Sequence, residues 1–266
     1  MLLRIPHLST LQHHPSYMST QNADPELAST PPSTRFDESL LDNPIWNSLK
    51  TEHQALALGE GAARRYPPAI GPLAGTPDQS QASYDSLKAL AGPGGLLGLF
   101  LPDPPAPPAG WSLFRGGLLT QMICHTPQLR SANRLAAGVS LRRLGTADVP
   151  AMVELATLTE PGPFRDRTIE LGVFYGIFEG DRLLAMAGQR MRVPGYVEVS
   201  AVCTHPDARG RGYAGTLMSE VMRDIVAAGA TPFLHAFADN PAIGLYQKLG
   251  FTQRRAFHLA VIKSDG

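Results

Sequence analysis

The chain has 266 residues and equal numbers of basic and acidic side chains, 23 of each. This length exceeds one small domain and suits two compact units. Because the charges balance, no overall field attracts a polyanion, which argues against nucleic acid or an acidic membrane surface as a partner. The two cysteines, Cys124 and Cys203, have no paired spacing, which argues against a disulfide framework and fits a reducing compartment.

The N-terminal segment carries no recognisable targeting signal. Its apolar residues are interrupted by Pro6 and His7, so they lack the core of a secretion signal. The longest apolar run, residues 96–101, is far shorter than the roughly 20 residues that span a membrane. We therefore expect a soluble, cytoplasmic protein. His13 and His14 lie in a polar segment, where histidine pairs are usually solvated, and we predict no metal site.

Residues 1–37 are rich in Ser, Thr and Pro and predict a mobile arm, with Met18 as a conceivable true start. Residues 38–133 are expected to form an α/β half of unknown role. The cap Asn43 with Pro44 behind it predicts a helix that ends near Gly59 or Gly61. Short strands are expected at 96–101 and 118–124, around a rigid proline-rich loop.

In the second half, residues 138–266, predicted strands and helices alternate. The strands are expected at 140–144, 176–179, 182–193, 196–203, 233–237 and 254–262. The helices are expected from Thr146 or Asp148 to about Leu158, from Gly212 to about Gly229, and at 241–249. This order predicts a mixed α/β sheet.

A glycine-rich loop between the strand that ends at Cys203 and the next helix indicates an anion site. The loop reads Arg209-Gly210-Arg211-Gly212-Tyr213-Ala214. Its glycines let backbone N–H groups approach a phosphate, the helix N-terminus adds a partial positive charge, and the two arginines add full charges.

The glycines alone also satisfy a dinucleotide fingerprint, Gly210-x-Gly212-x-x-Gly215. Only about fifty residues follow, however, and the strand around 233–235 ends without the acidic residue that would bind a ribose. A phosphate-binding lysine of the Walker type is absent as well. The position of the loop therefore argues against a dinucleotide.

Two motifs together resemble the GNAT superfamily of acyl-CoA N-acyltransferases. Arg209-x-x-Gly212-x-Ala214 on a strand, loop and helix resembles its motif A, and the segment from Asp239-Asn240-Pro241 to Leu249-Gly250-Phe251 resembles its motif B. The likeness covers residues 140–262 and is closest to the glycine-N-acyltransferase-like branch. It implies a central α/β (α+β) mixed sheet flanked by helices, preceded by a smaller N-terminal half for which residues 40–130 are a candidate degenerate copy, although they lack such a loop.

The resemblance also implies where acyl-CoA would bind. The strands 196–203 and 233–237 are expected to splay apart, so that the pantetheine arm fills the gap and a backbone N–H near Val202 acts as an oxyanion donor. Asn240 matches a motif B position that usually contacts the cofactor, and an Asx turn before the helix explains it equally well; both can hold together. The cofactor-binding set is Val202, Cys203, Thr204, Arg209, Gly210, Arg211, Gly212, Tyr213, Ala214, Asn240 and Tyr246.

Two residues are candidates for proton transfer. The resemblance places Tyr246 at the position of the acid that protonates the leaving thiolate, although it could simply pack. Glu198 lies on the polar face of its strand and is either the base for the acceptor amine or a solvated or salt-bridged glutamate. Cys203 is not favoured as a nucleophile because its side chain should face the apolar side of the strand.

The resulting hypothesis is an N-acyltransferase that moves an acetyl or other short acyl group from acetyl-CoA, or another acyl-CoA, to a primary amine of a small molecule or amino acid. Direct attack in a ternary complex is expected, without a metal. The alternatives are a non-catalytic acyl-CoA-binding sensor and a protein-lysine or N-terminal acetyltransferase. The presence of Tyr246 and Glu198 favours an enzyme.

Overall fold

The computed structural model describes residues 36–130 and 135–265. They belong to a single compact unit, Thr34–Gly266. The predicted arm, apart from its last two residues, lies outside the described residues, as do His13, His14 and Met18. Among the helices that are described, none is long and apolar enough to cross a membrane.

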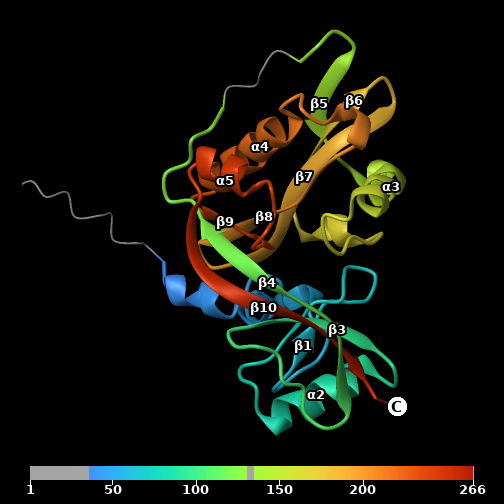
Figure 1. The fold of residues 1–266 in the computed structure, drawn as a ribbon, viewed down its shortest axis with the longest axis vertical. Helices are drawn as coiled ribbons and strands as arrows, with labels where there is room; N and C mark the ends of the chain where they lie inside the picture. The colour runs from blue at the N-terminus through green and yellow to red at the C-terminus, as the bar shows by residue number, and fades with distance from the viewer. Residues whose placement is uncertain (1–35, 131–134, 266) are drawn as a thin grey trace, which may run out of the picture. The chain divides into compact units, whose positions relative to one another are not determined.

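A mixed sheet of eight strands, in the order β3-β10-β4-β9-β8-β7-β6-β5, forms the centre of the fold (Figure 1). Within it, β8 and β9 pair in parallel and the other neighbours are antiparallel. The predicted mixed sheet is thus confirmed. The strands are β3 (Leu96–Leu101), β4 (Trp111–Ile123), β5 (Val139–Arg143), β6 (Phe174–Glu179), β7 (Arg182–Val193), β8 (Tyr196–Thr204), β9 (Thr231–Phe237) and β10 (Thr252–Ser264).

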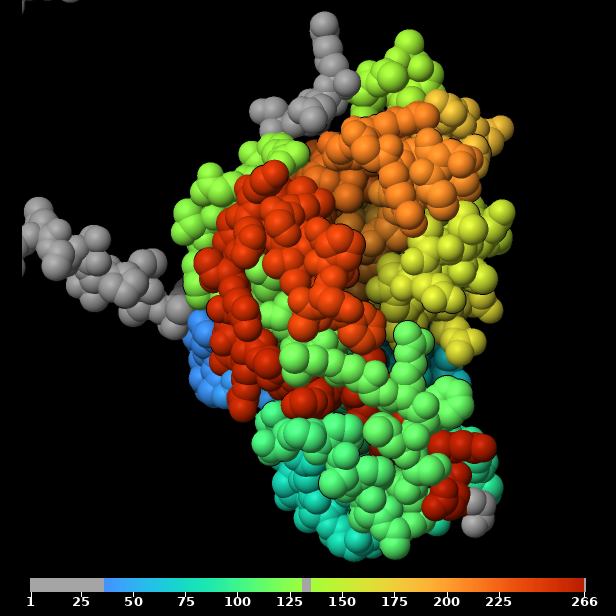
Figure 2. Space-filling view, in the orientation of Figure 1, coloured from blue at the N-terminus to red at the C-terminus, as the bar shows by residue number. Residues whose placement is uncertain are grey.

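Helices cover both faces of this sheet. The apolar stripe predicted from Gly212 onward forms α4 (Tyr213–Ala227), whose buried side chains share a core with residues of α5 (Ile243–Lys248). These two helices lie side by side in the space-filling view (Figure 2). The opposite face packs against α3 (Val149–Thr159) and α1 (Pro44–Lys50), because alternate residues of a strand point to opposite faces.

The first helix is shorter than predicted. It ends at Lys50, where Thr51 leaves the helical region, and a short 3-10 turn at Gln54–Leu56 follows. The turn lets His53 reach back into the core, where its ring nitrogen Nδ1 lies 2.9 Å from the Tyr66 hydroxyl. Tyr66 Oη in turn lies 3.0 Å from Ser48 Oγ. A buried polar contact has therefore overridden the local helical pattern.

Three small elements were not predicted. Helix α2 (Gln81–Ala91) begins behind Ser80, whose hydroxyl accepts a hydrogen bond from the Ser83 N–H, and it buries only Tyr84 and Leu87 as large apolar residues. The two-residue strands β1 (Arg64–Arg65) and β2 (Ala74–Gly75) form a separate two-stranded sheet. Such short strands leave no periodicity in the sequence.

Strand β4 connects the two predicted halves of the chain. It pairs with β10 from Trp111 to Ile123, and its last five residues pair with β9 on the other side. A strand from before residue 133 thus lies between two strands from after residue 138. The sheet has no break at the predicted boundary.

Candidate active site

Strands β8 and β9 begin as a pair and then separate. Their pairing runs from Tyr196 opposite Thr231 to Glu198 opposite Phe233 and stops there. Beyond this point β9 remains paired with β4 along its other edge. The edge of β8 that faced β9, at residues 199–204, has no strand partner in the described sheet. The backbone N–H and C=O groups on that side are therefore available to a ligand that lies along the strand.

A bulge lies just beyond the point of separation. The register between β7 and β8 shifts between Gly188 opposite Ser200 and Met186 opposite Cys203. Within it, Ala201 has a φ of 51°, a left-handed conformation that costs a non-glycine residue about 1–2 kcal/mol. A bulge takes backbone groups out of the ladder, and this one lies next to Val202, the predicted oxyanion donor.

The glycine-rich loop meets the N-terminus of α4 at the far end of β8. Gly210 and Gly212 have φ values of 77° and 78°, and Gly212 is the N-cap residue of α4. A Cβ atom added at either position would meet no other atom within 4 Å, so open space lies beside the first turn of the helix. These are the properties of a backbone anion site.

The side chains around this loop divide into two groups. Arg209 and Arg211 are exposed, and Arg211 donates a hydrogen bond of 3.2 Å to the Asp207 carbonyl. Tyr213 instead points into the core, so only its backbone can face a ligand. At Gly215 a Cβ would lie 3.3 Å from both Arg130 Nη1 and Leu245 Cδ1, so this third glycine is explained by close packing.

Motif B forms a turn followed by α5. The side chain of Asn240 accepts a hydrogen bond of 2.8 Å from the Ala242 N–H, which confirms the expected Asx turn. Tyr246 is buried against the core of α4 and stacks edge-on against Phe251. Burial raises the pKa of Tyr246, so its hydroxyl is protonated at neutral pH and can donate a proton or a hydrogen bond.

Glu198 is fully buried and held by two side chains. Arg190 donates two hydrogen bonds to its carboxylate, from Nε at 2.7 Å and from Nη2 at 2.6 Å. His235 Nδ1 lies 2.8 Å from Glu198 Oε1. Burial by itself would raise the pKa of Glu198, but the charge and hydrogen bonds of Arg190, with the hydrogen bond of His235, lower it to about 2. Glu198 is therefore salt-bridged, as one of its two interpretations expected, and its role as a base stays a prediction.

This ion pair belongs to a buried polar chain that crosses β7, β8, β9, β4 and β10 in turn. Arg254 donates to Gln121 Oε1 at 2.9 Å, which places the Gln121 amide nitrogen 3.0 Å from His235 Nε2. His235 Nε2 must then accept, so we assign its proton to Nδ1, which donates to Glu198. Burial lowers the pKa of His235, in agreement with a neutral ring. Arg190 and His235 were not predicted as site residues, although both lie in predicted strands.

The cysteines lie in apolar surroundings. Cys203 packs with the residues around α3, and burial raises its pKa to about 11, so it stays a thiol at neutral pH. The predicted apolar orientation of Cys203 is thus confirmed. Within the described ranges, no three His, Cys, Asp or Glu side chains are grouped so that they could hold a metal ion.

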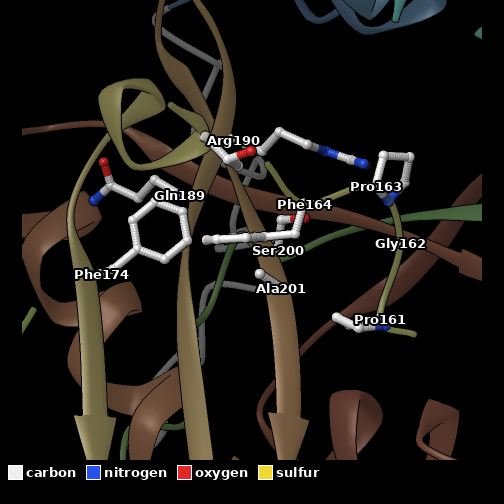
Figure 3. Close-up of a pocket in the computed structure, with 10 residues that line it drawn as sticks. Pro161, Gly162, Pro163, Phe164, Phe174, Gln189, Arg190, Ser200 and Ala201 are labelled. Atoms are coloured by element: carbon white, nitrogen blue, oxygen red, sulfur yellow. The ribbon is translucent and has the colours of Figure 1, made fainter. Parts of the chain in front are cut away.

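A pocket opens beside the bulge in β8 (Figure 3). Ser200 and Ala201 form part of its wall, and the segment that follows α3 contributes Pro163 and Phe164. Arg190 is the only charged side chain among the lining residues. Figure 3 shows its guanidinium on the side of the pocket where Pro163 lies, away from Phe174. We call this cavity the Arg190 pocket.

Comparison with known proteins agrees with this geometry. Residues 174–259 match the family model described as FR47-like protein. A crystal structure of an acetyltransferase assigned to the GNAT family, from Novosphingobium aromaticivorans, is 41% identical, with a TM-score of 0.77, over 85% of this chain and 99% of the other. A GCN5-related N-acetyltransferase from Kribbella flavida is 15% identical, with a TM-score of 0.55, over 82% of this chain and 95% of the other, and it shares the fold. No curated protein matches the sequence.

The match at 41% identity extends over nearly the whole of the Novosphingobium protein, including the region before residue 138. The separated strands, the glycine loop at the start of α4 and the turn before α5 all lie inside that match or inside residues 174–259. The chain belongs to the GNAT family of acetyltransferases.

Proposed function

We propose that this protein transfers an acetyl or other short acyl group from acyl-CoA to a primary amine of a small molecule or amino acid, by direct attack in a ternary complex. The observation that carries the proposal is the separation of β8 and β9 after Glu198 and Phe233, with the glycine loop at one end of the unpaired strand. The likeness to the glycine-N-acyltransferase-like branch stays a prediction.

Different parts of the site would bind different parts of acyl-CoA. Backbone N–H groups at Gly210 and Gly212, the N-terminus of α4 and the exposed guanidinium groups of Arg209 and Arg211 suit the CoA pyrophosphate. The unpaired side of β8 suits the amides of pantetheine, which would hydrogen-bond to it as another strand would. At the bulge, the N–H near Val202 would polarise the thioester carbonyl.

In the acyl transfer itself, one bond forms and one breaks. The acceptor nitrogen attacks the thioester carbon, and the C–S bond breaks to release a thiolate, whose parent thiol has a pKa of about 8.5. Tyr246 would give its hydroxyl proton to that sulfur, a role that suits a phenol kept protonated by burial. One proton of the acceptor ammonium leaves through water before the attack, and a second, lost from the nitrogen as the amide forms, restores the Tyr246 hydroxyl. Glu198 contributes by holding Arg190.

The first test is a calorimetric titration with acetyl-CoA, with NAD and ATP as controls, followed by a colorimetric assay of CoA thiol release with a panel of primary amines. Binding of acetyl-CoA alone and turnover with an amine support the enzyme. Binding without turnover on any amine or lysine peptide would identify a sensor, and turnover restricted to peptides would identify a protein acetyltransferase. Binding of NAD, or of nothing, would overturn the proposal.

A further inference from the structure

The Arg190 pocket combines one cation with apolar walls. Pro161, Pro163, Phe164 and Phe174 contribute apolar surface, and no acidic residue is among the lining residues. The side chain of Arg190 is 14% exposed, whereas that of its partner Glu198 is fully buried. Arg190 is therefore the member of this ion pair that lines the pocket.

A count of hydrogen-bond donors shows what Arg190 still offers. Its Nε and Nη2 atoms bind the two oxygens of Glu198. In the part of the chain that the structure describes, Nη1 has no hydrogen-bond partner, and it is not one of the buried atoms that lack one. Of the five N–H groups of Arg190, Glu198 takes two, so the two on Nη1 and one on Nη2 remain for a ligand, in an orientation that Glu198 fixes.

The orientation of Arg190 is unusually well determined. Glu198 is itself held by His235 and by the Met191 N–H, and the Arg190 guanidinium also lies over the Phe100 ring at 5.9 Å. A side chain held in this way loses little conformational entropy when a ligand binds. Such pre-organisation is what a specificity-determining contact requires.

Resting on the proposed function, we infer that Arg190 binds a carboxylate of the acceptor, so that the preferred substrates are amino acids or similar amino carboxylates. Ser200 and Ala201 line the same pocket next to the bulge where the thioester carbonyl would lie. In this inference the acceptor's carboxylate lies on Arg190 Nη1 and its amine points toward the bulge. One guanidinium group is enough to bind a carboxylate, whereas a phosphate usually binds to more than one cation and the pocket lining has only Arg190.

The test compares free amino acids with their primary amides, which keep the amine and lose the negative charge. With the full-length protein and acetyl-CoA, we expect kcat/KM to be about 10- to 100-fold higher for the acids. Arg190→Met should reduce that ratio to near one. Arg192→Met, on the same strand but outside the lining residues, should leave the ratio unchanged. A loss of folding alone would lower both rates together and leave the ratio as it was.

Two further measurements keep the inference separable from the proposed function. In the protein–CoA complex, calorimetric binding of N-acetyl amino acids and of their amides reports on Arg190 without any turnover. If amines are acetylated but neither assay distinguishes acid from amide, the inference is overturned and the function stands. If no amine reacts while N-acetyl amino acids bind through Arg190, the function fails and only carboxylate binding at Arg190 stands. Should Arg190→Met not fold, Arg190→Met with Glu198→Gln removes both charges and the same ratio is measured.

Discussion

Arg190 and Glu198 form a bidentate ion pair between neighbouring strands, with Nε–Oε2 and Nη2–Oε1 distances of 2.7 and 2.6 Å. Glu198 is also the last residue of β8 to pair with β9. The pair thus lies where the sheet opens, and it connects the Arg190 pocket to the buried polar chain through His235.

Removing one partner of this pair should destabilise the protein. Glu198→Gln leaves the buried guanidinium without its counter-charge, so we expect the free energy of unfolding to fall by about 3–5 kcal/mol. Urea denaturation followed by circular dichroism measures the change. The double variant with Arg190→Met should recover part of the loss, and equal stability of Glu198→Gln and wild type would contradict the assigned pairing.

A bulky side chain at the glycine loop should abolish acetyl-CoA binding. Gly212→Trp would fill the open space at the start of α4, where the pyrophosphate is proposed to bind. Gly229→Trp is a matched control, because Gly229 lies just beyond the other end of α4, has a φ of 75° and is equally open. Both variants carry the same backbone strain, so calorimetry should show binding lost in Gly212→Trp alone. Similar affinities in the two variants would place the pyrophosphate elsewhere.

Tyr246→Phe should reduce kcat by about a hundredfold, the typical contribution of a general acid. Because the ring is buried in the core and only its hydroxyl is removed, KM for acetyl-CoA and the unfolding midpoint should change little. Steady-state assays of thiol release measure both constants. Unchanged kcat would mean that Tyr246 only packs against Phe251.

The fold was predicted best where side chains alternate or repeat with a clear period. The stripe along α4 and the hairpin of β6 and β7 around Gly180-Asp181 were confirmed almost to the residue. Helix α1 was predicted too long because Ser48, His53 and Tyr66 meet only in three dimensions. A contact between residues 13 apart in the chain leaves no local signal.

In the candidate active site, too, local features could be predicted from the sequence and contacts between strands could not. The loop around Gly210 and Gly212 could be read from the sequence because backbone geometry requires glycine there. The partners of Glu198 could not, since Arg190 and His235 reach it from two different neighbouring strands. Strand order decides which of several polar residues meet, and order depends on tertiary packing.

Buried His53 should make stability depend on pH. Burial, followed by the nearby charge of Arg192, lowers the pKa of His53 from 6.5 to about 4. As the pH falls below 6.5, His53 becomes protonated in the unfolded chain but stays neutral in the folded protein. The free energy of unfolding therefore decreases between pH 6.5 and about 4, by about 3 kcal/mol in total. Urea denaturation from pH 7.5 to 4 should show a smaller loss in His53→Gln than in wild type. Parallel curves would show that His53 does not contribute.

The inserted strand β4 leads to the last prediction, which concerns where the chain can be cut. A fragment of residues 138–266 contains both sequence motifs but lacks β3 and β4. Strand β9 would then lose its partner at residues 233–237, and β10 would lose both of its neighbours. Buried Phe233 and Phe257 would then face water, and one edge of β9 and both edges of β10 would be open to aggregation. We therefore expect this fragment to be insoluble or unfolded and unable to bind acetyl-CoA, whereas a chain that begins at Thr34, the start of the compact unit, should fold and bind.

Size-exclusion chromatography and circular dichroism of the two fragments measure the difference. A monomeric, cooperatively unfolding 138–266 fragment would show that the second half completes its own core, and that β4 is an addition to the sheet.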